Sequence, residues 1–370
     1  MTPRPVSDAE RVHWLRLART PNIGPVTFFQ LLRRYKSAEA ALEALPELAS
    51  RAGRKTPLAA PLASKIEEEI EATYRHGARV LVAIEPDFPP LLRALDPPPP
   101  VIAALGDPSL LDRPAIAMVG ARNASAGGRK LARDMAAELG KAGYTIVSGL
   151  ARGIDGEAHA ATLKTGTAAV LGGGIDHVYP PQHDRLYAAV AAEGVLLSES
   201  PFGHRATAKD FPRRNRIITG CARGVVVIEA AERSGSLISA RTAGEQGREV
   251  MAVPGSPLDP RAAGTNRLIQ NGAALVRHAN DVLDIVSGLP GLKSVSAPPS
   301  ADLGPPQDTP PASQIAAVKS VLAPYSMPID EIARASDLGV SRCLAILMEL
   351  EIAGEVVTLP GGLAALNVDA

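Results

Sequence analysis

The chain has few of the residues that typify disulfide-rich, metal-binding or membrane-spanning proteins. Its 370 residues include only two cysteines, Cys221 and Cys343, and these lie in no spacing typical of metal ligands. We therefore expect no disulfide, no metal site and a reducing compartment. No uninterrupted apolar run approaches the roughly 20 residues that span a bilayer, and the amino terminus lacks the apolar core of a signal peptide. The sequence thus predicts a cytoplasmic protein without a membrane partner.

A net charge is absent as well. Lysine plus arginine equals aspartate plus glutamate, 39 of each, so any affinity for nucleic acid depends on a local patch. The densest patch is FPRRNRIITG at residues 211–220, where Arg213, Arg214, Asn215 and Arg216 are consecutive. Such a cluster favours an anionic partner, most commonly a phosphate backbone. A solvated basic turn is the alternative.

Residues 7–92 carry apolar side chains at three- and four-residue steps, which is the pattern of amphipathic helices. We predict an N-terminal helical domain over residues 1–92. Within it, PNIGPVTFFQLL begins at Pro21 and has the form of a turn containing Gly24 followed by a helix. This predicts a helix-hairpin-helix, whose turn amides hold a phosphate at a helix amino end. An ordinary helical hairpin is the alternative.

The proline-rich segment 96–100 leads into a predicted α/β domain at residues 93–287. Its strands are mostly near-continuous apolar runs, as expected when helices cover both faces of a sheet. They begin at Ala115, Tyr144, Thr167, Val195, Gly224, Glu249 and Ala274. Because glycine-containing turns and amphipathic segments alternate with these runs, the pattern predicts a doubly wound, mostly parallel sheet.

The C-terminal part changes composition twice. Residues 288–312 are rich in proline and serine, which predicts a disordered linker. Residues 313–370 contain three helical patterns and then EVVTLPGGLAAL, which predicts a winged helix with a two-stranded wing. The segment that would read DNA, 341–355, is acidic, with Arg342 against three glutamates. We therefore expect this domain to bind protein or to pack against its own chain instead of reading DNA.

Four turns at predicted strand ends combine glycine with hydroxyl or basic residues. They are VGARNAS at 119–125, SGLARGID at 148–155, LGGGIDHVYPP at 171–181 and EAAERSGSLISA at 229–240. Glycine lets a backbone approach a ligand closely, and successive amides form an anion-binding concavity. Each turn taken alone also fits tight strand-to-helix packing. None matches GxxxxGK[ST] or GxGxxG, so neither an NTPase nor a dinucleotide cofactor is expected, and we expect no cofactor at all.

Cations and aromatic residues surround these turns. Arg122 and Arg152 lie within two of them and would extend the Arg213–Arg216 cluster into a cationic lining if the loops converge. The chain is poor in aromatic residues, yet four lie in the flanking segment: Tyr179, Tyr187, Phe202 and Phe211. Unpaired bases stack on aromatic side chains interleaved with cations. Core packing is the alternative for Tyr187 and Phe211.

Material for catalysis is sparse. Asp155 and His159 are four residues apart and share a helix face, which also fits a helix cap and a buried histidine. Glu229 is a candidate general base, and Ser234 and Ser236 are candidate nucleophiles. Because no GxSxG motif accompanies the serines, contact with an anion is the favoured role for them. A Rossmann-like hydrolase acting on nucleotides is the alternative function, and a regulator sensing a phosphorylated ligand is a third.

The motifs VGAR, SGLARGIDGEAH, AVLGGGIDHVYP, FPRRNRIITG, VVVIEA, SGSLISA and GTNRLIQNGA together resemble the DNA-processing protein A family, also called Smf, over about residues 91–284. The resemblance implies an extended Rossmann-like domain that binds single-stranded DNA, forms a homodimer and loads the RecA recombinase in natural transformation, without being an enzyme. It also implies an N-terminal helical domain and a C-terminal winged helix. The family's DNA-binding positions correspond to Gly120, Arg122, Ser125, Gly172, Gly173, Gly174, Arg213, Arg214, Asn215 and Arg216.

Two departures from the family pattern bear on DNA contact. The first turn reads GAR where GSR is usual, so Ala121 removes a hydroxyl donor next to the arginine. In YPPQHDRLY, His183 stands where asparagine is common and Pro181 where lysine is frequent. We keep His183 among the predicted DNA-binding residues with a reduced weight.

Overall fold

The computed structural model describes residues 3–51, 59–289, 310–359 and 361–367. They form two compact units. The first is built from the described residues of 69–95 and 102–294, and the second from those of 4–68, 96–101 and 295–370. Each unit has a core of its own.

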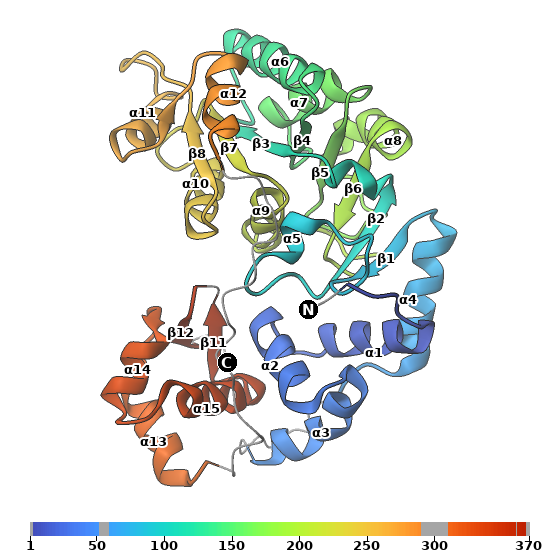
Figure 1. The fold of residues 1–370 in the computed structure, drawn as a ribbon, viewed down its shortest axis with the longest axis vertical. Helices are drawn as coiled ribbons and strands as arrows, with labels where there is room; N and C mark the ends of the chain where they lie inside the picture. Colours follow the sequence, from blue (N-terminus) through green and yellow to red (C-terminus); the bar gives the residue numbers. More distant parts are fainter. Residues whose placement is uncertain (1–2, 52–58, 290–309, 360, 368–370) are drawn as a thin grey trace. The chain divides into compact units, whose positions relative to one another are not determined.

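The first unit contains a nine-stranded sheet in the order β1-β2-β6-β5-β4-β3-β7-β8-β9 (Figure 1). The strands are β1 (Arg79–Val82), β2 (Val101–Gly106), β3 (Ala115–Gly120), β4 (Thr145–Ser148), β5 (Thr167–Val170), β6 (Val195–Ser198), β7 (Gly224–Ile228), β8 (Glu249–Ala252) and β9 (Ala274–Leu275). All pairs from β6 to β9 are parallel, whereas β2 pairs with β6 in the antiparallel sense. The seven strands expected from the sequence all form. Strands β3 to β7 are buried almost throughout, as expected when helices cover both faces, whereas the edge strand β9 is partly exposed.

Helices cover both faces of this sheet. Their bounds are α5 (Pro90–Arg93), α6 (Ala126–Lys141), α7 (Ile154–Thr162), α8 (Asp184–Glu193), α9 (Asp210–Gly220), α10 (Gly235–Glu245), α11 (Ala263–Gln270) and α12 (Ala279–Ser287), with 3-10 turns η1 (Pro108–Leu111) and η2 (Pro181–His183). The helices α6, α7, α8 and α12 lie on one face, and α9 and α10 lie on the other (Figure 1). The predicted doubly wound fold is therefore confirmed.

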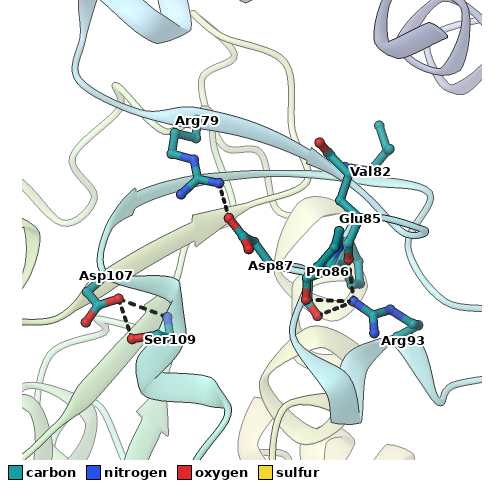
Figure 2. A network of polar contacts seen from close by, with 9 residues as sticks. Arg79, Val82, Glu85, Pro86, Asp87, Arg93, Asp107 and Ser109 are labelled. Carbon is teal, nitrogen blue, oxygen red and sulfur yellow. Dashed lines mark hydrogen bonds and ion pairs between the residues drawn. The ribbon is translucent and has the colours of Figure 1, made fainter. Parts of the chain in front are cut away.

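The sheet begins earlier in the chain than expected. The sequence pattern suggested helix as far as residue 92, whereas RVLV forms β1 at 79–82. The loop after β1 is held by Arg93, whose guanidinium donates hydrogen bonds to the carbonyls of Ala83, Glu85, Pro86 and Phe88, and most of this network is drawn in Figure 2. Burial lowers the pKa of Arg93, and the negative charge of Asp112 opposes that shift. A strand such as β1, which forms only by pairing with residues distant in the sequence, leaves no periodic signal in the sequence.

The N-terminal part of the second unit is helical, as predicted. Its helices are α1 (Asp8–Ala18), α2 (Pro25–Tyr35), α3 (Ala38–Arg51) and α4 (Ala63–Arg75), the last of which continues into the first unit. Trp14 of α1 packs against Phe28 and Phe29 of α2, with ring centroids 5.1 and 6.2 Å away. These three buried rings fix the angle of the helical hairpin around residues 19–24.

The C-terminal part of the same unit is a winged helix. It contains α13 (Ala312–Val321), β10 (Met327–Pro328), α14 (Ile329–Ala335), α15 (Val340–Ala353), β11 (Val356–Leu359) and β12 (Leu363–Leu366). The wing predicted from the sequence is confirmed as β11 and β12, and β10 adds a third strand in the order β10-β12-β11. Of the predicted linker 288–312, residues 290–309 lie outside the described residues.

Among the helices that the structure describes, none is long and apolar enough to cross a membrane.

Candidate nucleic-acid interface

The turns after three neighbouring strands meet at a recess of about 40 Å³. These strands are β3, β4 and β5, whose parallel pairing brings their carboxyl ends to one edge of the sheet. The start of α9 completes the wall. Five predicted residues line the recess: Arg122, Arg152, Gly172, Gly173 and Arg214. A water molecule needs about 10–15 Å³ of such space, so the recess holds a group of the size of a phosphate, not a whole nucleotide.

Several lining residues were not among the predicted contacts. They are Gly149, Ala151, Leu171, His177, Tyr179, Pro180 and Phe211. Their position in the glycine turns 148–155 and 171–181 is the signal that identifies most of them. Phe211 and Tyr179 had been singled out only as aromatic residues near the cations.

The arginine cluster forms the fourth to seventh residues of helix α9, not a surface turn. Helical periodicity therefore points its neighbouring side chains in different directions. Arg214 is 8% exposed and donates from Nη2 to the carbonyl oxygen of Gly149 at 2.8 Å. A Cβ at Gly149 would lie 1.5 Å from the Nη1 atom of Arg214, so only glycine accommodates this guanidinium. Burial lowers the pKa of Arg214 to about 10, and the nearby Asp155 opposes that shift.

The turn at 149–151 uses its own amides internally. The carboxylate of Asp155 accepts hydrogen bonds from the N–H groups of Gly149 at 3.1 Å and Ala151 at 3.4 Å. The N–H of Leu150, a residue with φ of +54°, donates to Nε2 of His159 at 3.3 Å. Burial raises the pKa of Asp155 and lowers that of His159 to about 3, so the imidazole is neutral and free to accept. Its Nδ1 atom lies 2.7 Å from the hydroxyl of Thr167.

His183 supports the same turn from the other side. Its Nδ1 atom lies 2.9 Å from the carbonyl oxygen of Leu150 and donates to it. Two histidines thus hold one residue in the left-handed region, which is costly for a side chain of this size. His183 does not line the recess.

The turn at 172–174 is arranged in the opposite way. The carbonyl oxygens of Gly172 and Gly173 accept hydrogen bonds from Ser200 and Ser198 at 2.9 and 2.6 Å. The N–H of Gly174 donates to another carbonyl in the chain. Within the described part of the chain, the N–H groups of Gly172 and Gly173 have no acceptor, although both residues are buried. Buried backbone donors are nearly always paired, so these two point to a ligand.

The first turn, after β3, already holds an anion of its own. Glu229 accepts hydrogen bonds from the N–H of Ser125 at 2.8 Å and from its hydroxyl. The Ser125 hydroxyl also caps α6 by accepting from the N–H of Gly128 at 2.9 Å. At Gly120 a Cβ would lie 1.9 Å from the carbonyl oxygen of Ile228, so this glycine serves close strand packing.

The other predicted residues lie outside the recess. Arg216 forms an ion pair with Glu199, and the side-chain amide of Asn215 is 3.5 Å from the carbonyl oxygen of Gly235. The hydroxyls of Ser234 and Ser236 lie 2.6 Å apart at the start of α10. None of these residues lines the recess.

Three exposed arginines keep their charge available at this edge. In the described part of the chain, Arg122, Arg152 and Arg213 have no carboxylate partner. The guanidinium of Arg122 lies 5.2 Å from the ring centroid of Phe211, and Tyr179 lies 5.3 Å from the same ring. Tyr179 is 42% exposed, so a flat apolar surface stands beside the free cations.

The two remaining aromatic residues have structural roles. Tyr187 is buried, its hydroxyl donates to the carbonyl oxygen of Ile175, and burial raises its pKa to about 12. Phe202 packs edge-on against His76, with centroids 5.8 Å apart. No cluster of metal-binding side chains is found among the described residues.

The fold and the site together define a class of three-domain proteins. Its doubly wound α/β domain carries a cationic recess at the strand ends and is flanked in sequence by a helical domain and a winged helix. Three family models match its parts. The DNA recombination-mediator protein A model matches residues 79–287, the DprA-like N-terminal HHH domain matches 8–72, and the DprA winged helix domain matches 299–362. The chain belongs to the DNA-processing protein A family.

Relatives and solved structures agree with this assignment. The chain is 32% identical to Protein Smf of Synechocystis, over 96% of this chain and 98% of that protein. The X-ray structure of DprA from Streptococcus pneumoniae has a TM-score of 0.62 at 33% identity, covering 76% of this chain and 98% of that one. A Helicobacter pylori DprA structure, described by its single-stranded DNA binding mode, has a TM-score of 0.52 at 27% identity, covering 57% and 95%.

Proposed function

We propose that this protein binds single-stranded DNA at the edge of the sheet formed by the turns after β3, β4 and β5. The observation that carries the proposal is the pair of unpartnered N–H groups of Gly172 and Gly173 in a recess lined by Arg122 and Arg152. Backbone donors and guanidinium groups together are the usual ligands of a phosphate. The H. pylori relative, named for its binding of single-stranded DNA, supports the same assignment.

Most of the predicted contact residues fall into two groups under this proposal. We infer that DNA is contacted by the four of them that line the recess without holding it, and by one exposed arginine beside it: Arg122, Arg152, Gly172, Gly173 and Arg213. Others hold the site: Gly120, Ser125, Gly174, His183, Arg214, Asn215, Ser234 and Ser236. The charge of Arg216 is neutralised by its ion pair with Glu199. The supporting residues are also constrained, by their contacts within the chain. This explains why the motifs that contain them are as specific as the motifs that contain the DNA-contact residues.

An unpaired strand fits the site better than a duplex. Tyr179 and Phe211 present ring surface beside the cations, and a base stacks on such a ring only when it is unpaired, at about 1–3 kcal/mol per base. Two of the four glycine turns hold their own carboxylates, Asp155 and Glu229, and so offer no further anion site. The phosphate contacts are therefore few.

We further propose that the protein acts in the cytoplasm as a homodimer that protects incoming strands during natural transformation and loads RecA onto them. This part rests on family membership. A non-catalytic role fits the site, because Glu229 is bonded to Ser125, while Ser234 and Ser236 are bonded to each other. Among the residues that the structure describes, no base forms a hydrogen bond with either serine.

Binding is tested with a labelled single strand and a duplex of the same sequence, each titrated over a series of salt concentrations. We expect at least about tenfold tighter binding to the single strand, weakening with added salt as counterions are released less readily. Equal affinity for the two forms would contradict the proposal.

Loading is tested by RecA filament growth on strands coated with single-strand-binding protein, which this chain should accelerate.

The hydrolase alternative has its own test. Purified protein is incubated with nucleoside monophosphates and compared with the Glu229→Gln variant. Turnover that the variant lacks would establish an enzyme, whereas we expect no turnover from either protein.

A further inference from the structure

The second helix of the winged-helix turn, α15, has no free face along much of its length. Every residue from Ile346 to Ile352 is buried. A winged helix that reads duplex DNA places this helix in the major groove, which needs one exposed face. A helix buried on all sides is instead enclosed by protein. Within this unit, α15 packs against α2 and α3 of the N-terminal helices as well as against its own domain.

A buried carboxylate forms the centre of this contact. Glu351 of α15 is 5% exposed and accepts hydrogen bonds from the N–H and the hydroxyl of Thr358, at 3.1 and 2.6 Å. It also accepts one from the hydroxyl of Thr27 in α2. Burial raises the pKa of Glu351, and these three donors oppose that shift. Hydrogen bonds from two domains therefore stabilise one buried group.

The amino end of α2 lacks a cap of its own. Its N-cap residue, Gly24, has no side chain to accept a hydrogen bond, and Pro25 contributes no donor. A carboxylate oxygen of Glu351 lies 3.7 Å from where a Cβ on Gly24 would be. The same hairpin approaches the end of α15 at Asn22, whose Nδ2 atom would be 3.0 Å from a Cβ on Gly354. A negative charge beside a helix amino end is favourable, and this end is where a helix-hairpin-helix holds a phosphate.

We propose that α15 is a docking helix for the chain's own helix-hairpin-helix turn, with the Glu351 carboxylate in the place that a DNA phosphate would take. The helix-hairpin-helix turn then covers α15, with which the winged helix would contact nucleic acid. In return, α15 covers the amino end of α2, with which the helix-hairpin-helix would contact nucleic acid. The Glu351 carboxylate, which would repel a phosphate backbone, suits the positive end of α2. This inference is independent of single-strand binding by the α/β domain.

A matched pair of substitutions at Thr27 tests the docking in the full-length protein. Thr27→Glu and Thr27→Gln have nearly the same size, but only the glutamate places a like charge against Glu351. Thr27 is the third residue of α2, where glutamate is favourable for the helix itself. We expect amide hydrogen exchange in α15 to become at least about tenfold faster in Thr27→Glu, and to change much less in Thr27→Gln.

The Glu351→Gln substitution in the Thr27→Glu background separates undocking from damage to α2. Removing the second charge should return exchange in α15 to within about threefold of wild type. The proposal is overturned if Thr27→Glu leaves exchange in α15 unchanged. It is equally overturned if the second substitution does not restore protection, because α2 would then have failed by itself.

Discussion

The turns after β4 and β5 look alike in sequence and are opposite in state. At 149–151 all three N–H groups are taken by Asp155 and His159, and the carbonyls of Gly149 and Leu150 accept from Arg214 and His183. At 172–173 the carbonyls are bonded, whereas the two N–H groups have no acceptor among the described residues. A glycine-rich turn is therefore either a structural support or a binding surface. We call the bonded turn at 149–151, with Asp155, His159, His183 and Arg214, the frame. The difference is whether the chain supplies the anion itself.

The largest effect should come from breaking the frame at Arg214. Arg214→Ala leaves the carboxylate of Asp155 buried without its cation, which should lower the free energy of unfolding by about 3–5 kcal/mol. The adjacent Arg213→Ala removes an exposed side chain and should change it by less than about 0.5 kcal/mol. Urea denaturation of the two variants makes the measurement. Equal losses would mean that Arg214 is not part of the frame.

The frame also predicts a dependence of stability on pH. Because the pKa of His159 is lowered to about 3 in the folded state, the unfolded chain binds more protons between that value and the usual 6.5 or so. Stability should therefore fall as pH falls through this window, by up to about 1.4 kcal/mol per unit from this group. His159→Gln should flatten that slope in denaturation measured from pH 7 to pH 4. An unchanged slope would contradict a lowered pKa of His159 in the folded state.

Substitutions of exposed recess residues should affect binding and spare stability. Arg122→Ala removes an exposed cation from the recess and should weaken single-strand affinity about tenfold, with the salt slope reduced by ~0.7. Lys164→Ala is the matched control, because this exposed cation precedes β5 and lies toward the amino ends of the strands. Affinity by fluorescence anisotropy should separate the two. A similar loss in both would indicate only general charge attraction.

The smallest expected effect concerns a cation that the chain neutralises. Glu199→Gln removes the carboxylate that pairs with Arg216 and should strengthen single-strand binding about two- to threefold. Glu245→Gln, which frees Arg241 on the exposed side of α10, serves as control. Weaker binding in Glu199→Gln would show that the ion pair shapes the site instead of competing with DNA.

Much of the fold was predictable because its signals are local. Five of the seven predicted strands, β3 to β7, are apolar runs that are buried almost throughout, and the helices keep their periodicity. Strands β1 and β2 were both missed. β1 has only four residues beside a helix and carries little signal, and β2 pairs with β6, which is distant in the sequence. The roles of neighbouring arginines were not predictable either. Whether Arg213 or Arg214 turns inward depends on where α9 begins and on the missing side chain of Gly149, 65 residues away.

The second unit is assembled mainly from the two ends of the chain, from the described residues of 4–68 and 295–370 together with 96–101, and most of the α/β domain lies between these ends in the sequence. The N-terminal helices and the winged helix thus form one unit, although the chain that connects them passes through the α/β domain. A single proteolytic cut between residues 289 and 310 should therefore leave two fragments that migrate together in native gel filtration. The winged helix would remain attached to the protein without a covalent bond, held at the α2–α15 contact.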